Sequence, residues 1–150
     1  MTKKIKRRTF IKTTAAAAGA AAVFPKSLFS SPIKKKVKIG FIGTGLRGQW
    51  MLWLAAKYED VDIPAICDID DGMVGEALKI IKDSGKPAPR IYKKNDEDFL
   101  NMLKHEDLDG VYIATPWEWH HPMAIAAMKF GKHVGTEVPA ALTVDDCWDL

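Results

Sequence analysis

The chain has 150 residues, 47% of them apolar and 27% charged, a composition typical of globular proteins rather than of disordered or collagen-like chains. Residues 1–36 carry ten Lys or Arg and no acidic residue, so residues 37–150 carry a net charge of −7 although the whole chain has +3. An acidic body does not attract a phosphate backbone, which argues against a nucleic-acid partner, and no apolar run reaches the roughly 18 residues of a membrane-spanning helix.

The first 36 residues are predicted to be a leader and linker. Residues 6–12 have the sequence Lys-Arg-Arg-Thr-Phe-Ile-Lys, and a weakly apolar, alanine-rich stretch follows over residues 15–24. This pattern resembles a twin-arginine export signal, although Lys6 stands where Ser or Thr is usual. The alternatives are a disordered basic tail and an amphipathic surface anchor. The resemblance implies the twin-arginine export machinery as a partner, a periplasmic location, and a cofactor bound before export, because this route carries folded proteins.

Residues 37–150 are predicted to form one domain in which strands and helices alternate. The expected strands are Val37–Ile42, Ile63–Cys67, Arg90–Tyr92, Gly110–Ala114 and His133–Glu137, and the expected helices cover residues 46–58, 73–82, 96–104, 120–130 and 144 onward. Apolar strands that alternate with helices indicate a parallel sheet covered on both faces. We therefore predict an α/β fold with a doubly wound parallel sheet, a Rossmann fold, and no room for a second domain.

A glycine-rich segment, Gly43-Thr44-Gly45-Leu46-Arg47-Gly48, joins the first strand to the first helix. In this context Gly43 permits a tight turn, Gly45 lets the backbone approach a pyrophosphate, and Gly48 lets the helix pack on the strand. The unpaired amides at the start of the helix then face the phosphate charge. The segment predicts a dinucleotide site, and the alternative is an ordinary strand-to-helix turn.

Asp68 lies twenty residues beyond Gly48, at the carboxyl end of the second strand. A carboxylate there can accept hydrogen bonds from the hydroxyls of the adenosine ribose and repels a 2′-phosphate, which favours NAD over NADP. The alternative is a helix cap, a role that Asp70 or Asp71 could fill better.

Thr115-Pro116-Trp117-Glu118-Trp119-His120 follows the fourth strand, at the sheet edge where ligands bind in such folds. Two tryptophans on a connecting loop could place flat rings near a nicotinamide or a sugar, or could pack on a second domain absent from this chain. His120, expected to begin the next helix, could donate to a phosphate or hydroxyl, or could be a helix-start residue with a satisfied imidazole.

Glu137 ends the fifth strand at the same edge, where it could hold a ribose or nicotinamide group or be a buried, paired structural glutamate, while Pro139 fixes the turn. The two cysteines, Cys67 and Cys147, stand far apart and have no ligand spacing, so we expect no zinc site. Cys67 is expected in the core.

These blocks together resemble the glucose-fructose oxidoreductase and inositol dehydrogenase family, through the glycine segment and the stretches Thr115–His120, Gly131–Val134 and Glu137–Pro139. Val138 occupies the place of a lysine that assists proton transfer in those dehydrogenases, so the resemblance to an ordinary dehydrogenase is broken there. The sequence of residues 114–120 and 137–143 is more specifically similar to that of glycosyl hydrolase family 109, the NAD-dependent α-N-acetylgalactosaminidases.

The resemblance implies a cofactor, a substrate and a mechanism. It assigns NAD contacts to Leu46, Arg47, Asp68, Trp117, Glu118, Trp119, His120, Glu137 and Val138. It places the catalytic and substrate-binding residues in a second domain beyond this chain. The implied substrate is an amino-sugar glycoside, oxidised at C3, cleaved by elimination, hydrated and reduced again, so that NAD is recycled. An exported sugar oxidoreductase and a non-catalytic nucleotide-binding fragment are the alternatives, and a homo-oligomer is left open.

Overall fold

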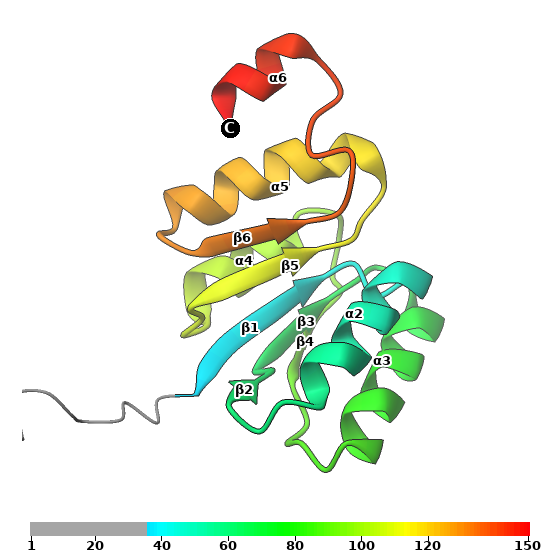
Figure 1. Ribbon diagram of the computed structural model, residues 1–150. Helices are drawn as coiled ribbons and strands as arrows, with labels where there is room; N and C mark the ends of the chain where they lie inside the picture. The colour runs from blue at the N-terminus through cyan, green and yellow to red at the C-terminus, as the bar shows by residue number, and fades with distance from the viewer. Residues whose placement is uncertain (1–35) are drawn as a thin grey trace, which may run out of the picture. The chain divides into compact units, whose positions relative to one another are not determined.

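The computed structural model describes residues 36–150, which fold into a single parallel sheet with helices on both sides (Figure 1). The predicted leader lies outside the described residues, apart from its last residue. The elements in chain order are β1 (Val37–Ile42), α2 (Leu46–Ala56), β2 (Val61–Asp62), β3 (Ala65–Cys67), α3 (Asp71–Asp83), β4 (Arg90–Tyr92), α4 (Asp98–His105), β5 (Gly110–Ile113), α5 (Trp117–Lys129), β6 (His133–Thr136) and α6 (Val144–Asp149). No helix in this described part combines the length and apolarity needed to cross a membrane.

The strands are ordered β4-β3-β1-β5-β6, and the short β2 pairs with the start of β1. Every pairing is parallel. The chain moves outward from β1 in one direction through β3 and β4, and then returns to build β5 and β6 on the other side. The carboxyl ends of β1 and β5 therefore flank the point at which the strand order reverses, where open α/β sheets bind their ligands. The predicted doubly wound Rossmann fold is confirmed.

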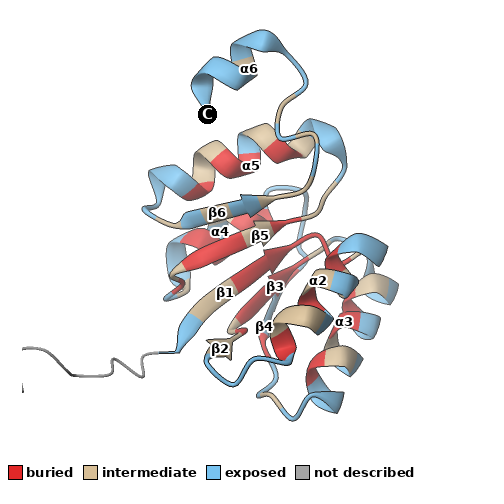
Figure 2. Ribbon diagram, in the orientation of Figure 1, coloured by how far each residue is buried: buried red, intermediate tan, exposed pale blue. Residues whose placement is uncertain are grey.

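The core consists of two layers, one on each face of the sheet. Successive residues of a strand point to opposite faces, so Phe41 packs with the residues of α2 and α3 while Ile42 packs with those of α4 and α5. Figure 2 shows the burial concentrated in the central strands and on the inward faces of these helices. Both layers bury the central strands β1, β3 and β5, whereas the edge strands β4 and β6 keep exposed residues.

The predicted second strand, Ile63–Cys67, is wrong at its start. Val61–Asp62 pairs with the beginning of β1, and the next strand begins only at Ala65, after Ile63 and Pro64 have interrupted the ladder. Proline has no N–H to donate, although the Pro64 carbonyl still accepts from Arg90 N at 2.8 Å. The first helix ends two residues earlier than expected, and the last strand one residue earlier.

Candidate functional site

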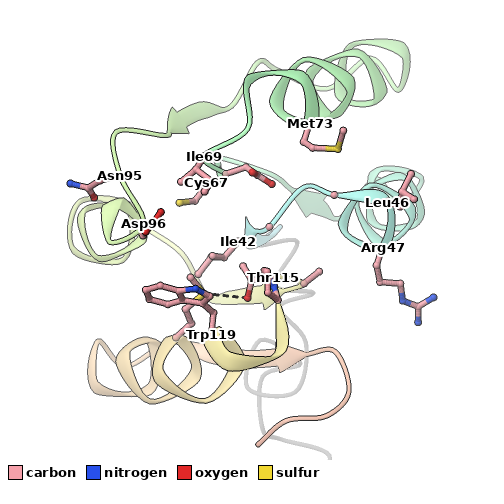
Figure 3. Close-up of a pocket in the computed structure, with 16 residues that line it drawn as sticks. Ile42, Leu46, Arg47, Cys67, Ile69, Met73, Asn95, Asp96, Thr115 and Trp119 are labelled. Atoms are coloured by element: carbon pink, nitrogen blue, oxygen red, sulfur yellow. Dashed lines mark hydrogen bonds between the residues drawn. The ribbon is translucent and has the colours of Figure 1, made fainter. Parts of the chain in front are cut away.

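A cavity of about 460 Å³ lies at the carboxyl edge of the sheet, across the ends of β1, β3, β4 and β5. Figure 3 shows that the lining residues come from strand ends and helix starts that are far apart in sequence. The lining residues are Ile42, Gly43, Gly45, Leu46, Arg47, Cys67, Asp68, Ile69, Met73, Asn95, Asp96, Ala114, Thr115, Pro116, Trp119 and Met123. The cavity coincides with the topological switch point, and its volume is in the range of ligand pockets.

The glycine turn brings β1 into close contact with the end of β5. Gly43 has φ +85°, and a Cβ placed on it would lie 2.7 Å from the backbone of Ala114. A Cβ on Gly48 would lie 2.1 Å from the carbonyl oxygen of Gly43, so only glycine lets α2 begin this close to the turn. Gly43 forms the tight turn, as predicted. Gly48 allows close packing of α2, but its close contact is with the glycine turn and not, as predicted, with the strand.

Gly45 differs from its two neighbours because nothing lies within 4 Å of the position where its Cβ would stand. Its backbone, at φ −63° and ψ −172°, does not require glycine either. Since neither the fold nor the backbone accounts for this residue, the missing side chain leaves open room in the wall of the cavity. This open room at Gly45 fits a ligand group that approaches the backbone closely.

The start of α2 supplies hydrogen-bond donors beside that room. Gly45 offers no side-chain cap, and the first intrahelical bond of α2 runs from Gln49 N to Gly45 O at 2.8 Å. The backbone amides of Leu46 and Arg47 come before Gln49 in the helix and have no intrahelical acceptor. Together with the helix dipole, such amides attract an anion such as a diphosphate.

Asp68 holds the glycine turn in place. Its Oδ2 accepts from Thr44 N at 2.5 Å and from the Thr44 hydroxyl at 3.0 Å, while its Oδ1 accepts from Asp70 N at 2.9 Å. A carboxylate has about four acceptor positions, so roughly one remains for a ligand in the cavity. Asp70, not Asp68, caps α3 by accepting from Met73 N at 3.0 Å. The helix-cap alternative for Asp68 is therefore wrong.

The prediction that Trp117, Glu118 and Trp119 lie on a connecting loop is wrong, because α5 begins at Trp117. Pro116 occupies the N-cap position, where a missing N–H costs nothing. Within this first turn the side chains separate: Trp119 lines the cavity and packs edge-on against Phe99, at 6.5 Å between ring centroids. Trp117 is 62% exposed and lies outside the cavity wall.

His120 is the fourth residue of α5 and is buried, with 1% of its surface exposed. Its Nδ1 lies 2.7 Å from the carbonyl oxygen of Pro139, and its Nε2 lies 2.8 Å from that of Thr115. The imidazole thus ties the segment after β5 to the segment after β6. Both ring nitrogens face backbone carbonyls instead of the cavity, which favours the alternative of a helix-start residue held within the fold.

Glu137 also joins separate elements, because its Oε1 accepts hydrogen bonds from Arg47 Nε at 2.6 Å and from the hydroxyl of Tyr112. These two bonds hold the pKa of Glu137 below its usual value, with Tyr112 as the larger cause. Burial and the bond to Glu137 raise the pKa of Tyr112 to about 12. Glu137 is 16% exposed and has the paired environment of the structural alternative, whereas Arg47 is 61% exposed and lines the cavity.

Six of the twelve predicted site residues line the cavity, and six do not. Those in the wall are Gly43, Gly45, Leu46, Arg47, Asp68 and Trp119; those outside it are Gly48, Trp117, Glu118, His120, Glu137 and Val138. Val138 is exposed at the end of the sheet.

Ten of the sixteen wall residues were not predicted as site residues, among them Ile69, Met73, Asn95 and Asp96. A signal for two of them exists, since Asn95 and Asp96 follow the third predicted strand and so belong to the same sheet edge. Among residues 36–150, no group of three or more His, Cys, Asp or Glu side chains could hold a metal ion.

Two family profiles match the sequence. Residues 37–150 match the Gfo/Idh/MocA profile, described as an oxidoreductase family with an NAD-binding Rossmann fold. Residues 4–24 match the twin-arginine translocation pathway signal sequence, which supports the predicted export signal.

Curated relatives are named either glycosyl hydrolase family 109 protein or alpha-N-acetylgalactosaminidase. The chain is 40% identical to a glycosyl hydrolase family 109 protein of Saccharopolyspora erythraea, over 96% of this chain and 35% of the relative. It is 42% identical to an alpha-N-acetylgalactosaminidase of Shewanella oneidensis, over 80% of this chain and 26% of the relative. The chain therefore spans about a quarter to a third of the length of the curated relatives that it matches.

Solved structures resemble the fold at lower identity. A scyllo-inositol dehydrogenase from Lactobacillus casei, solved with bound NAD(H) and scyllo-inositol, superposes with a TM-score of 0.63 at 28% identity. The match covers 75% of this chain and 31% of the dehydrogenase.

Proposed function

Because the chain belongs to the Gfo/Idh/MocA oxidoreductase family with an NAD-binding Rossmann fold, we propose that its folded domain binds NAD in the cavity at the carboxyl edge of the sheet. The observation that carries this proposal is the open room at Gly45 beside the first amides of α2. The residues there suit a diphosphate, which needs close backbone approach and free N–H donors.

The proposed contacts follow the cavity wall. The amides at the start of α2, with Arg47, hold the diphosphate, and the acceptor position that remains on Asp68 takes a hydroxyl of the adenosine ribose. The negative charge of Asp68 would repel a 2′-phosphate, which favours NAD over NADP. Trp119 supplies an aromatic wall, while His120 fixes the surrounding segments rather than contacting the cofactor.

For the whole protein we propose an exported glycosidase of the family 109 type that acts on an α-N-acetylgalactosaminide or a related amino-sugar glycoside in the periplasm. The support is the identity of 40–42% to relatives of that name and the match to an export signal. Bound NAD would supply a hydride acceptor that returns its hydride within the same turnover. This domain would hold that cofactor while the sugar is bound elsewhere in the protein.

An exported sugar oxidoreductase is the second candidate, because the chain resembles an inositol dehydrogenase in structure at 28% identity. The two candidates differ in their products. The full-length protein should release p-nitrophenol from p-nitrophenyl α-N-acetylgalactosaminide without accumulating NADH at 340 nm. Accumulation of NADH or a ketosugar, with no glycoside cleavage, would support the oxidoreductase instead.

A further inference from the structure

We propose that Glu137 is a positioning residue that holds the Arg47 side chain at the cavity wall for a bound diphosphate, and that Glu137 does not itself contact the cofactor. This inference rests on the proposed function, since it assumes that a dinucleotide occupies the cavity. It differs from the expectation that Glu137 holds a ribose or nicotinamide group.

The two residues of this pair have unequal access to the cavity. Arg47 belongs to the cavity wall and is 61% exposed, whereas Glu137 is outside the wall and only 16% exposed. The Arg47 side chain is therefore more accessible to a bound group than the Glu137 carboxylate is.

Hydrogen bonds to β5 also fix the position of Glu137. Glu137 accepts from the Tyr112 hydroxyl, and its backbone N donates to Ile113 O at 3.0 Å, so two bonds fix it to β5. Arg47 Nε then donates to the same oxygen at 2.6 Å. The rigid partner is the glutamate, and the side chain that gains order is the arginine.

An arginine bonded through Nε keeps its remaining donors. A guanidinium carries five N–H groups, of which the bond to Glu137 uses the one on Nε, and the four on the terminal nitrogens can donate to phosphate oxygens. Because a free arginine loses considerable rotamer freedom when it binds a ligand, one that is already held loses less. Glu137 would thus raise affinity by pre-organising Arg47.

The molecule contains a matched trio that serves as a control. At β4, Glu106 Oε1 accepts from the Tyr92 hydroxyl at 2.5 Å and lies 2.9 Å from Arg90 Nη1, with 67% exposure for the arginine and 12% for the glutamate. The chemistry and the exposure repeat those of Arg47, Glu137 and Tyr112. None of the trio at β4 belongs to the cavity wall.

The test compares ligands that share parts of NAD. Calorimetric titrations of NAD, ADP and adenosine are made on the wild-type chain, on Glu137→Gln, on the control Glu106→Gln, on Arg47→Met and on the double variant. Glu137→Gln should weaken NAD and ADP equally, by about two- to tenfold, and leave adenosine unchanged. Glu106→Gln should lower the melting temperature about as much as Glu137→Gln does, with no change in the affinity for NAD, ADP or adenosine.

The double variant distinguishes an indirect role from a direct one. In the Arg47→Met background, Glu137→Gln should cause no further loss, because the side chain that it orders is gone. A loss for NAD alone with ADP unaffected, a loss that persists without Arg47, or no loss at all would overturn the proposal.

Two further results have their own interpretation: a Glu137→Gln variant that does not fold, and a wild-type chain that binds no nucleotide. If Glu137→Gln does not fold, Arg47→Met at its exposed position must still weaken ADP more than adenosine, and equal effects would overturn the proposal. If the wild-type chain binds neither NAD nor ADP, the proposed function itself fails, whatever the variants do.

Discussion

Two glycines three residues apart should respond to the same substitution in opposite ways. Gly45→Ala should leave the fold intact and weaken dinucleotide binding, because its methyl group would enter the open room in the cavity wall without touching the protein. Gly48→Ala should damage the fold, because its methyl group would stand 2.1 Å from Gly43 O. The pair separates the glycine that serves a ligand from the glycine that serves packing.

The magnitudes follow from these distances. Ordinary van der Waals contact begins at 3.4 Å, so Gly48→Ala requires a backbone shift of roughly 1.3 Å, and overpacking of this kind costs about 1–3 kcal/mol. For a domain of this size that corresponds to a fall of about 4–12 °C in melting temperature. Gly45→Ala should change stability by less than about 1 kcal/mol, since a loss at the N-cap opposes a gain from a stiffer unfolded chain. Its affinity for NAD should fall at least about tenfold, or 1.4 kcal/mol.

The assay is a thermal melt and an NAD titration on each variant, with Gly75→Ala as the matched control. Gly75 lies within α3, and nothing stands within 4 Å of its absent Cβ, so alanine there should stabilise the helix by about 0.5–1 kcal/mol. Gly45→Ala with unchanged NAD affinity would refute the proposal that the open room at Gly45 serves the ligand. A Gly48→Ala variant as stable as the wild type would refute the packing argument.

Three further outcomes are expected. Asp68→Asn should weaken NAD binding and narrow the preference for NAD over NADP, because the charge that repels a 2′-phosphate is lost; an unchanged ratio of the two affinities would exclude that role. The melting temperature of wild type minus that of Glu137→Gln should be constant above pH 4.5 and shrink as the pH falls further, since a lowered folded-state pKa stabilises the fold only while the carboxylate is ionised; a difference that grows in acid would contradict this. A thiol reagent at pH 8 should label Cys147, which is exposed, and spare Cys67, whose burial raises its pKa to about 12, until denaturant is added; rapid labelling of both in the native chain would contradict the burial of Cys67.

The sequence was sufficient for the fold because its signals are local. The apolar runs of β1 and β5 and the glycines at the turn each depend on neighbouring residues, and the structure places them as expected, except that β5 ends one residue early. Asp68 was found by its distance from the glycine turn, which the βαβ geometry fixes.

The errors concern contacts between distant segments. The bonds of His120 to Pro139 and of Glu137 to Arg47 join residues 19 and 90 positions apart, which no periodicity reveals. Sequence spacing correctly predicted that these residues lie at the carboxyl edge of the sheet. It could not show that they bind other protein groups instead of facing the cavity. The start of α5 was misplaced for a different reason. Trp117 and Trp119 are weak helix formers, but the proline at the N-cap and the packing of the partly buried Trp119 against the core hold them in the first turn.

Titration of NAD into the purified protein, followed by calorimetry, tests the central claim most directly. We expect saturable heat at one NAD per chain, and NADP at least about tenfold weaker because of the carboxylate of Asp68. A folded protein that gives no heat with either nucleotide would contradict the account.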